Sequence, residues 1–361
     1  MERASLRMVA IAAGLAAMPV AATDWNWADD PYAQRPEYAE SVAICERLRE
    51  LRPPAVDHPN PAQAQALADC DSEALYYGIG MAADPVRARQ CALFEAEAAE
   101  PDQYSSFSGN GLLMTIYANG IGAERNLDLA TAFACGIHGA PFEVVGRVQH
   151  LQALKASPQT DGDFSYCDDI TSGTAGAICA RHAARLDEDR RVHRLAGLSE
   201  RWSDTDRAAF DPLHSTATAF ARISAENEVD LSGSSRWAFV AQHEQQLLDA
   251  FLALLETLES NSLPIATRAE LTAADDRLNA VYRQLMTLPA EADAPAEHAD
   301  RLGRGTVTRS GVREAQRAWI GYRDAWITFA AKRYWQMDDS VATWLTRQRA
   351  DDLARYLPEH G

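Results

Sequence analysis

Side chains of the types that catalyse reactions are present in this sequence, but their spacing does not bring them together. His243-Glu244 begins like the helix of a zinc protease, yet Leu247 stands where the second histidine ligand is needed. Acidic neighbours such as Asp168-Asp169, Asp338-Asp339 and Asp351-Asp352 point about 100° apart on a helix, so they do not converge on one substrate. We therefore predict no catalytic residues, no metal site and no cofactor, and a protein that binds a partner and is not an enzyme.

The six cysteines are a second set of reactive side chains, and none of them lies in a CxxC pair. In an exported protein an even set of this kind forms disulfides. Cys167 and Cys179 flank a turn rich in Gly, Ser and Thr, and pairing them would stabilise the fold by about 2–4 kcal/mol through the unfolded state. We predict this pair, and we predict that the other four are paired in an order that the sequence leaves open: Cys45, Cys70, Cys91 and Cys135.

The start of the chain has the pattern of a secretory signal. Arg3 and Arg7 are followed by an apolar run from Met8 to Val20 and by the small residues Ala21-Ala22. The run is too short to span a bilayer. We predict that residues 1–22 are a signal peptide and that the protein is periplasmic or secreted, in a Gram-negative-type envelope, with no membrane span. The alternative is a buried N-terminal helix.

The charge of the chain restricts its partners. The formal net charge of −18 argues against nucleic acid and anionic lipid, and favours a basic protein partner or a purely solubilising role. The distribution is uneven, because eleven basic and seven acidic side chains lie between Arg301 and the end of the chain. The acidic excess belongs to the rest of the molecule.

Helices must position these side chains, because Ala, Leu, Arg and Glu are abundant and β-branched runs are scarce. A helix, a glycine turn and a second helix are predicted twice, with Gly78, Gly80 and Ala88 repeated 42 residues later as Gly120, Gly122 and Ala130. The pattern over residues 64–140 resembles the Sel-type repeat, a relative of the tetratricopeptide repeat. That resemblance implies an interaction scaffold.

The strongest helical periodicity lies near the C-terminus, where four aromatic residues form one stripe: Trp319, Tyr322, Trp326 and Phe329. The stripe either packs into the core of a helical bundle or, with Gln316, Arg323 and Asp324 beside it, forms a recognition face.

Two segments resemble the lysozyme-inhibitor LprI-like family of exported helical domains, and the clearer match is C-terminal. Residues 276–285 match its L-N-x-x-Y-x-x-L helix, and residues 313–324 match its Q-R-x-W-x-x-Y-R-D helix. A weaker resemblance begins at Cys167, and the cysteine that family members often carry after the R-D pair is absent. The resemblance implies a periplasmic binding protein that inhibits a basic lysozyme by protein contact, through residues of the second motif: Gln316, Arg317, Trp319, Tyr322, Arg323 and Asp324. The alternative is a non-enzymatic envelope scaffold or assembly factor that docks a partner on its repeats.

The predicted fold is therefore all-α, with two stacked, repeat-like helical hairpins followed by a helical bundle. After the signal peptide we predict an N-terminal segment (residues 23–60) and a Sel-like helical repeat region (61–155). A disulfide-containing domain with degenerate LprI-like character (165–260) and an LprI-like domain (265–361) follow.

Overall fold

Helices form all the regular secondary structure in the part of the chain that the computed structural model describes, residues 25–98, 106–157, 163–289, 295–303 and 305–358. No strand occurs within these ranges, which confirms the all-α prediction. The predicted signal peptide, residues 1–22, lies outside the described residues. None of the described helices combines the length and the apolar composition that a membrane crossing requires.

The described residues divide into two units. Unit 1 takes the described residues within 25–72, 85–138 and 148–163, and unit 2 takes those within 73–84, 139–147 and 164–358. Two helices contribute residues to both units: α3 (Ser72–Tyr77) and α7 (Pro141–Ala156).

Unit 1 is built on three helices that pack in chain order, α4 (Pro85–Ala98), α5 (Gly109–Asn119) and α6 (Leu127–Cys135), with α1 (Ala39–Leu48) against α6. It also contains α2 (Pro61–Gln65) and four short 3-10 helices: η1 (Trp27–Asp29), η2 (Pro31–Gln34), η3 (Pro36–Tyr38) and η4 (Ala55–Asp57). Disulfides join Cys45 to Cys135, between α1 and α6, and Cys70 to Cys91 on α4. These bonds fix the connectivity that the sequence left open.

The two glycine turns of the internal repeat have the same geometry. Gly78 and Gly120, which follow α3 and α5, have φ of +77° and +69°, the left-handed conformation that ends a helix. Backbone hydrogen bonds across the turns also correspond at the 42-residue spacing: Asp84 N–H to Leu75 O at 2.8 Å, and Asn126 N–H to Tyr117 O at 2.9 Å. The repeat is thus present in the backbone, whereas the resemblance to the Sel-type family remains a prediction.

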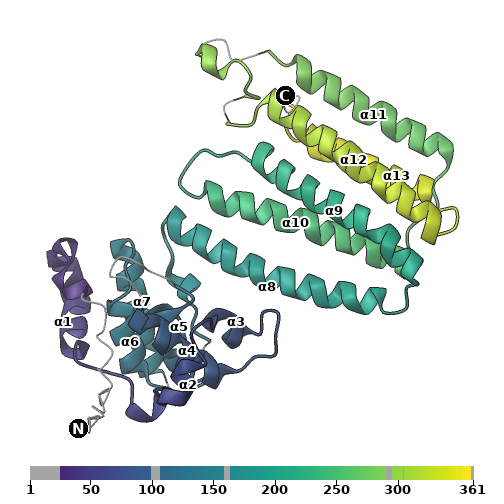
Figure 1. Ribbon diagram of the computed structural model, residues 1–361. Coiled ribbons are helices and arrows are strands. Elements are labelled where there is room, and N and C mark those ends of the chain that lie inside the picture. Colours follow the sequence, from purple (N-terminus) through teal and green to yellow (C-terminus); the bar gives the residue numbers. More distant parts are fainter. Residues whose placement is uncertain (1–24, 99–105, 158–162, 290–294, 304, 359–361) are drawn as a thin grey trace, which may run out of the picture. The chain divides into compact units, whose positions relative to one another are not determined.

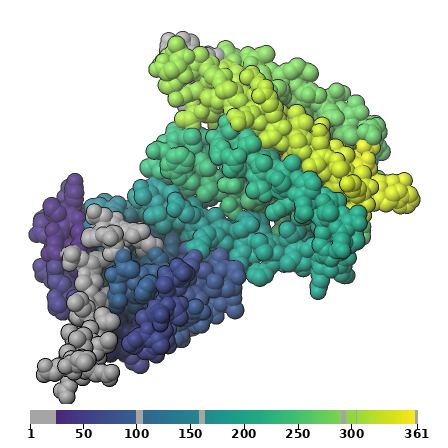
Figure 2. All heavy atoms as spheres, viewed as in Figure 1, coloured from purple at the N-terminus to yellow at the C-terminus, as the bar shows by residue number. Residues whose placement is uncertain are grey.

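Unit 2 contains six long helices: α8 (Gly173–Ser199), α9 (Asp204–Asn227), α10 (Arg236–Glu259), α11 (Arg268–Thr287), α12 (Arg309–Arg333) and α13 (Asp338–Ala354). Two 3-10 helices accompany them, η5 (Tyr166–Asp169) and η6 (Ala296–His298). Packing follows the order α8, α10, α9, α12, α13, α11, as the stack in Figure 1 shows. In Figure 2 the yellow band of α12 and α13 runs between the light-green α11 and the teal α9.

Local sequence signals account for where these helices begin. The Ser203 hydroxyl accepts a hydrogen bond from the backbone of Asp206, whose carboxylate accepts one in return from the Ser203 N–H, a capping box at the start of α9. Thr267 and Glu270 form the same arrangement at α11. A third disulfide, Cys167–Cys179, ties η5 to α8, and disulfide bonding of the cysteines is confirmed.

Candidate functional site

The aromatic stripe of α12 lies in the core of unit 2. Trp319, Tyr322, Trp326 and Phe329 are all buried, because α12 packs between α9 and α13. The ring of Tyr322 stacks on Phe220 of α9 with centroids 5.3 Å apart. The core interpretation of the stripe is therefore correct. The recognition-face interpretation is wrong for Trp319 and Tyr322, since a partner protein does not reach side chains that other helices cover.

The polar residues of the same motif divide between the inside and the outside of the bundle. Gln316 accepts a hydrogen bond of 2.8 Å from Nε of Arg349 on α13. Arg323 donates to Asp275 on α11 at 3.1 Å and lies 5.1 Å from the centroid of the Trp319 ring. Arg317 and Asp324 are exposed on the outward face of α12. Of the six residues predicted for binding, these two are the ones that are exposed.

A buried ion pair joins α9 to α13, and the sequence analysis did not anticipate it. Arg349 donates two hydrogen bonds to the carboxylate of Glu228, of 2.9 and 2.6 Å, and each side chain is only 3% exposed. Ser224 donates to the same carboxylate at 2.7 Å, and the Tyr356 hydroxyl donates to the backbone oxygen of Glu228. Since Gln316 also contacts Arg349, the pair locks α9, α12 and α13 in register.

His243 on α10 lies at the edge of this ion-pair network, with Nε2 3.0 Å from the Ser224 hydroxyl. Burial lowers the pKa of His243, and the nearby carboxylates of Glu228 and Asp352 offset only part of that effect. A histidine whose pKa is lower in the folded than in the unfolded protein binds its proton more readily after unfolding. The folded state therefore loses stability as the pH falls below about 6.5, the ordinary pKa of histidine.

We expect the variant His243→Gln to have a shallower fall of unfolding free energy between about pH 7 and pH 5 than the wild-type protein. Urea titrations at several pH values measure this slope. The wild-type protein, measured at the same pH values, is the control. An unchanged slope in the His243 variant would show that this histidine is not the group responsible.

A second polar network lies at the opposite end of α12. Arg333 donates to both carboxylate oxygens of Glu259 at the end of α10, at 2.9 and 3.1 Å, and to Asp206 of α9 at 2.9 Å. The hydroxyl of Tyr334 donates to Glu259 at 2.6 Å. Burial acts to raise the pKa of Glu259, but the hydrogen bonds from Arg333, Tyr334 and Trp202 outweigh it and the pKa is lowered. The carboxylate is thus held in its charged form, and the residues around it hold this end of the bundle together.

Two connections meet at this end of the bundle, residues 260–267 between α10 and α11 and residues 334–337 between α12 and α13. The backbone N–H of Ala266 donates to the Ser340 hydroxyl at 2.8 Å, and Arg268 pairs with Asp339 at 3.1 Å. Trp335 is 86% exposed and Ile265 is 82% exposed. We call Pro264, Ile265 and Trp335, all of them exposed, the apolar end of the bundle.

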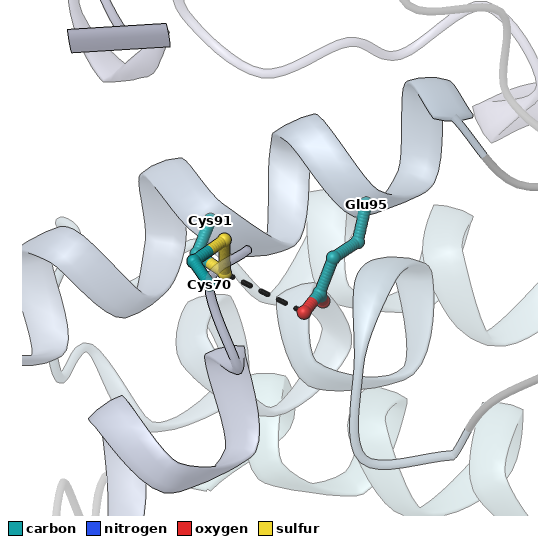
Figure 3. Close-up of side chains that lie close together, drawn as sticks. All are labelled: Cys70, Cys91 and Glu95. Atoms are coloured by element: carbon teal, nitrogen blue, oxygen red, sulfur yellow. Dashed lines mark hydrogen bonds between the residues drawn. A yellow bond between two sulfur atoms is a disulfide. The ribbon is translucent and has the colours of Figure 1, made fainter. Parts of the chain in front are cut away.

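One group of potential metal ligands comes together in the described residues, Cys70, Cys91 and Glu95 in unit 1 (Figure 3). The two sulfur atoms are bonded to each other, so neither is a thiolate that could bind a metal. Glu95 accepts hydrogen bonds from the backbone of Ser72 and of Gly109, at 3.1 and 2.9 Å. The group is therefore a structural link: the disulfide and the carboxylate together fasten the starts of α3 and α5 to α4.

Comparison with known proteins gives one match. The sequence model of the family described as Lysozyme inhibitor LprI matches residues 256–353, less than a third of the chain. The matched range runs from the last residues of α10 to the end of α13, and it includes both connections of the apolar end. No curated protein and no solved structure matches the chain.

Proposed function

We propose that this protein is an exported inhibitor of lysozyme-type muramidases that acts by protein contact through α11–α13. The observation that carries the proposal is the family match at residues 256–353, which coincides with helices that pack on one another. Three disulfides support an oxidising compartment. The signal-like pattern of residues 1–22 supports export.

The charge of the chain suits a basic muramidase. A formal net charge of −18 attracts a cationic protein over long range and speeds its association at low salt. The excess of arginine near the C-terminus does not oppose this, because several of these arginines form ion pairs with acidic residues of neighbouring helices: Arg323 with Asp275, Arg333 with Glu259, Arg347 with Glu270, and Arg349 with Glu228.

The motif residues predicted for binding have two proposed roles in this function. Arg317 and Asp324 are exposed and are available for direct contact with the enzyme. Gln316, Trp319, Tyr322 and Arg323 support that surface from within, since their partners are other residues of unit 2.

We expect the purified full-length chain to inhibit a basic c-type lysozyme at low ionic strength, and to inhibit it less at high ionic strength, because salt screens the charge attraction. Initial rates of cell-wall lysis, measured at several inhibitor and salt concentrations, test this. A basic protein of similar size without muramidase activity is the control for binding by charge alone. Absence of inhibition at every salt concentration would contradict the proposal.

The second candidate function is a non-enzymatic envelope scaffold that docks a partner through the repeats. The matching geometry of the turns at Gly78 and Gly120 favours it, because such repeats present extended surfaces. A chain that does not inhibit lysozyme but retains a protein from periplasmic extract would support this alternative. A helix-preserving surface change on α11–α13 that abolishes retention would place the contact outside the repeats.

A further inference from the structure

We propose that the apolar end of the bundle, Pro264, Ile265 and Trp335, is the surface that contacts the muramidase, with Trp335 entering the substrate cleft of the enzyme. This inference rests on the proposed function and specifies the site through which it acts. The residues come from two connections that are distant in sequence and that the fold brings to one end of α10–α13.

The exposure of these side chains is the first observation behind the inference. Trp335 and Ile265 are 86% and 82% exposed, whereas the tryptophans of the α12 stripe are buried. Leaving large apolar side chains in water forgoes the stabilisation that burial would give. Tryptophan is also among the residues that contribute most to protein–protein binding when a partner covers it. The surface is therefore suited to burial in a complex.

The backbone of both connections is a defined turn. Among the described residues, the non-glycine residues with positive φ are Asn261 at 52° and Gln336 at 59°, and each lies in one of the two connections. Asn261 ends α10 in a Schellman motif, because its N–H donates to Leu258 O and the Ser262 N–H donates to Thr257 O, both at 3.0 Å. The Met337 N–H donates to Tyr334 O at 3.2 Å across the turn that carries Trp335 and Gln336.

Fixed contacts on both sides of Trp335 limit its movement. Arg333 and Tyr334 are bonded to Glu259, and Ser340 accepts the hydrogen bond from Ala266 that ties the two connections together. A side chain presented by a rigid backbone loses less conformational entropy on binding than one on a flexible loop. The apolar end is thus ordered before a partner arrives.

The shape and charge of the surface favour a muramidase as the binding partner. Ligand clefts of enzymes are concave and lined mainly by apolar and aromatic side chains, which suits the insertion of an exposed aromatic ring such as that of Trp335. The charge of −18 favours a cationic protein and disfavours a second copy of this chain, which would carry the same charge. Both connections also lie within the family match at residues 256–353, unlike Trp237, an exposed tryptophan near the start of α10.

Paired tryptophan variants of the full-length chain test the inference. We expect Trp335→Ala to raise the inhibition constant for a basic lysozyme at least about 30-fold, the loss typical of a central anchor residue. The matched control is Trp237→Ala, which removes a 58% exposed tryptophan from the other end of α10 and should change the constant less than about twofold. Ile265→Asp, on the second connection, should weaken inhibition independently, and chitotriose should compete with the wild-type inhibitor for the cleft.

The possible results separate the inference from the proposed function. If the Trp335 and Ile265 variants both inhibit lysozyme as strongly as the wild type, the inference is overturned and the proposed inhibitor function is left intact. Loss of inhibition in the Trp237 variant instead would place the contact with the enzyme at the opposite end of the bundle. Binding of the wild-type chain to lysozyme that chitotriose does not displace would exclude entry into the cleft. A wild-type chain without inhibition would overturn the proposed function and the inference with it.

Discussion

Replacing Arg349 with alanine should lower the free energy of unfolding of unit 2 by about 3–5 kcal/mol, because it leaves the carboxylate of Glu228 buried without its countercharge. Both side chains are 3% exposed, so water does not replace the lost guanidinium unless the residues packed around the pair move apart. The variant also removes the donor to Gln316, which weakens the link to α12. Urea denaturation followed by circular dichroism measures the change.

The sequence offers a matched control two positions away. Arg347→Ala removes an ion pair with Glu270 in which both side chains are about half exposed, so the variant should lose much less stability than Arg349→Ala. The double variant Glu228→Leu/Arg349→Met replaces both charges with apolar groups and should recover most of the stability lost by Arg349→Ala. Equal effects of the Arg347 and Arg349 variants would contradict a buried, mutually dependent pair.

The second large effect is expected for Trp326→Ala, at about 3–5 kcal/mol of unfolding free energy. Trp326 is fully buried, and its ring lies 5.4 Å from that of Phe251 on α10 and 6.2 Å from that of Phe329. Truncation would leave a cavity between α9, α10 and α12 that the rigid helices do not fill. Thermal and urea denaturation both report the loss.

Trp335→Ala is the matched control for this core variant, because it makes the same chemical change at an exposed position. We expect it to change stability by no more than about 0.5 kcal/mol. The two variants should therefore differ: Trp326→Ala is expected to lower stability, and Trp335→Ala is expected to weaken the proposed inhibition. A stability loss of several kcal/mol on replacing Trp335 would mean that its ring packs against the protein, which would weaken its assignment as a contact residue.

Local structure followed closely from the sequence. The glycines at 78 and 120 marked helix turns, because a left-handed turn depends on a few neighbouring residues. The capping box of Ser203 and Asp206 at the start of α9 is equally local. The spacing of the α12 aromatics likewise indicated a helix with one apolar face. It did not decide between a core and a recognition face, since both require the same side chains.

The ion pair of the buried Arg349 could not be predicted from the sequence pattern. Val341, Leu345, Arg349 and Leu353 recur every fourth residue of α13, so Arg349 occupies a position on the buried stripe. That placement alone signals a buried charge. Its partner, Glu228, lies 121 residues earlier in the chain, and no local pattern connects the two.

The sequence by itself determined the helical composition, the internal repeat and the resemblance to a lysozyme-inhibitor family, because these depend on short-range patterns of residue type. Only the tertiary structure decided that Trp319 and Tyr322 are buried while Trp335 and Ile265 are exposed. The physical reason is that exposure depends on which helices cover a face. The α12 stripe is covered by α9 and α13 and by the ring of Phe251 on α10, which lie next to α12 only after the chain has folded.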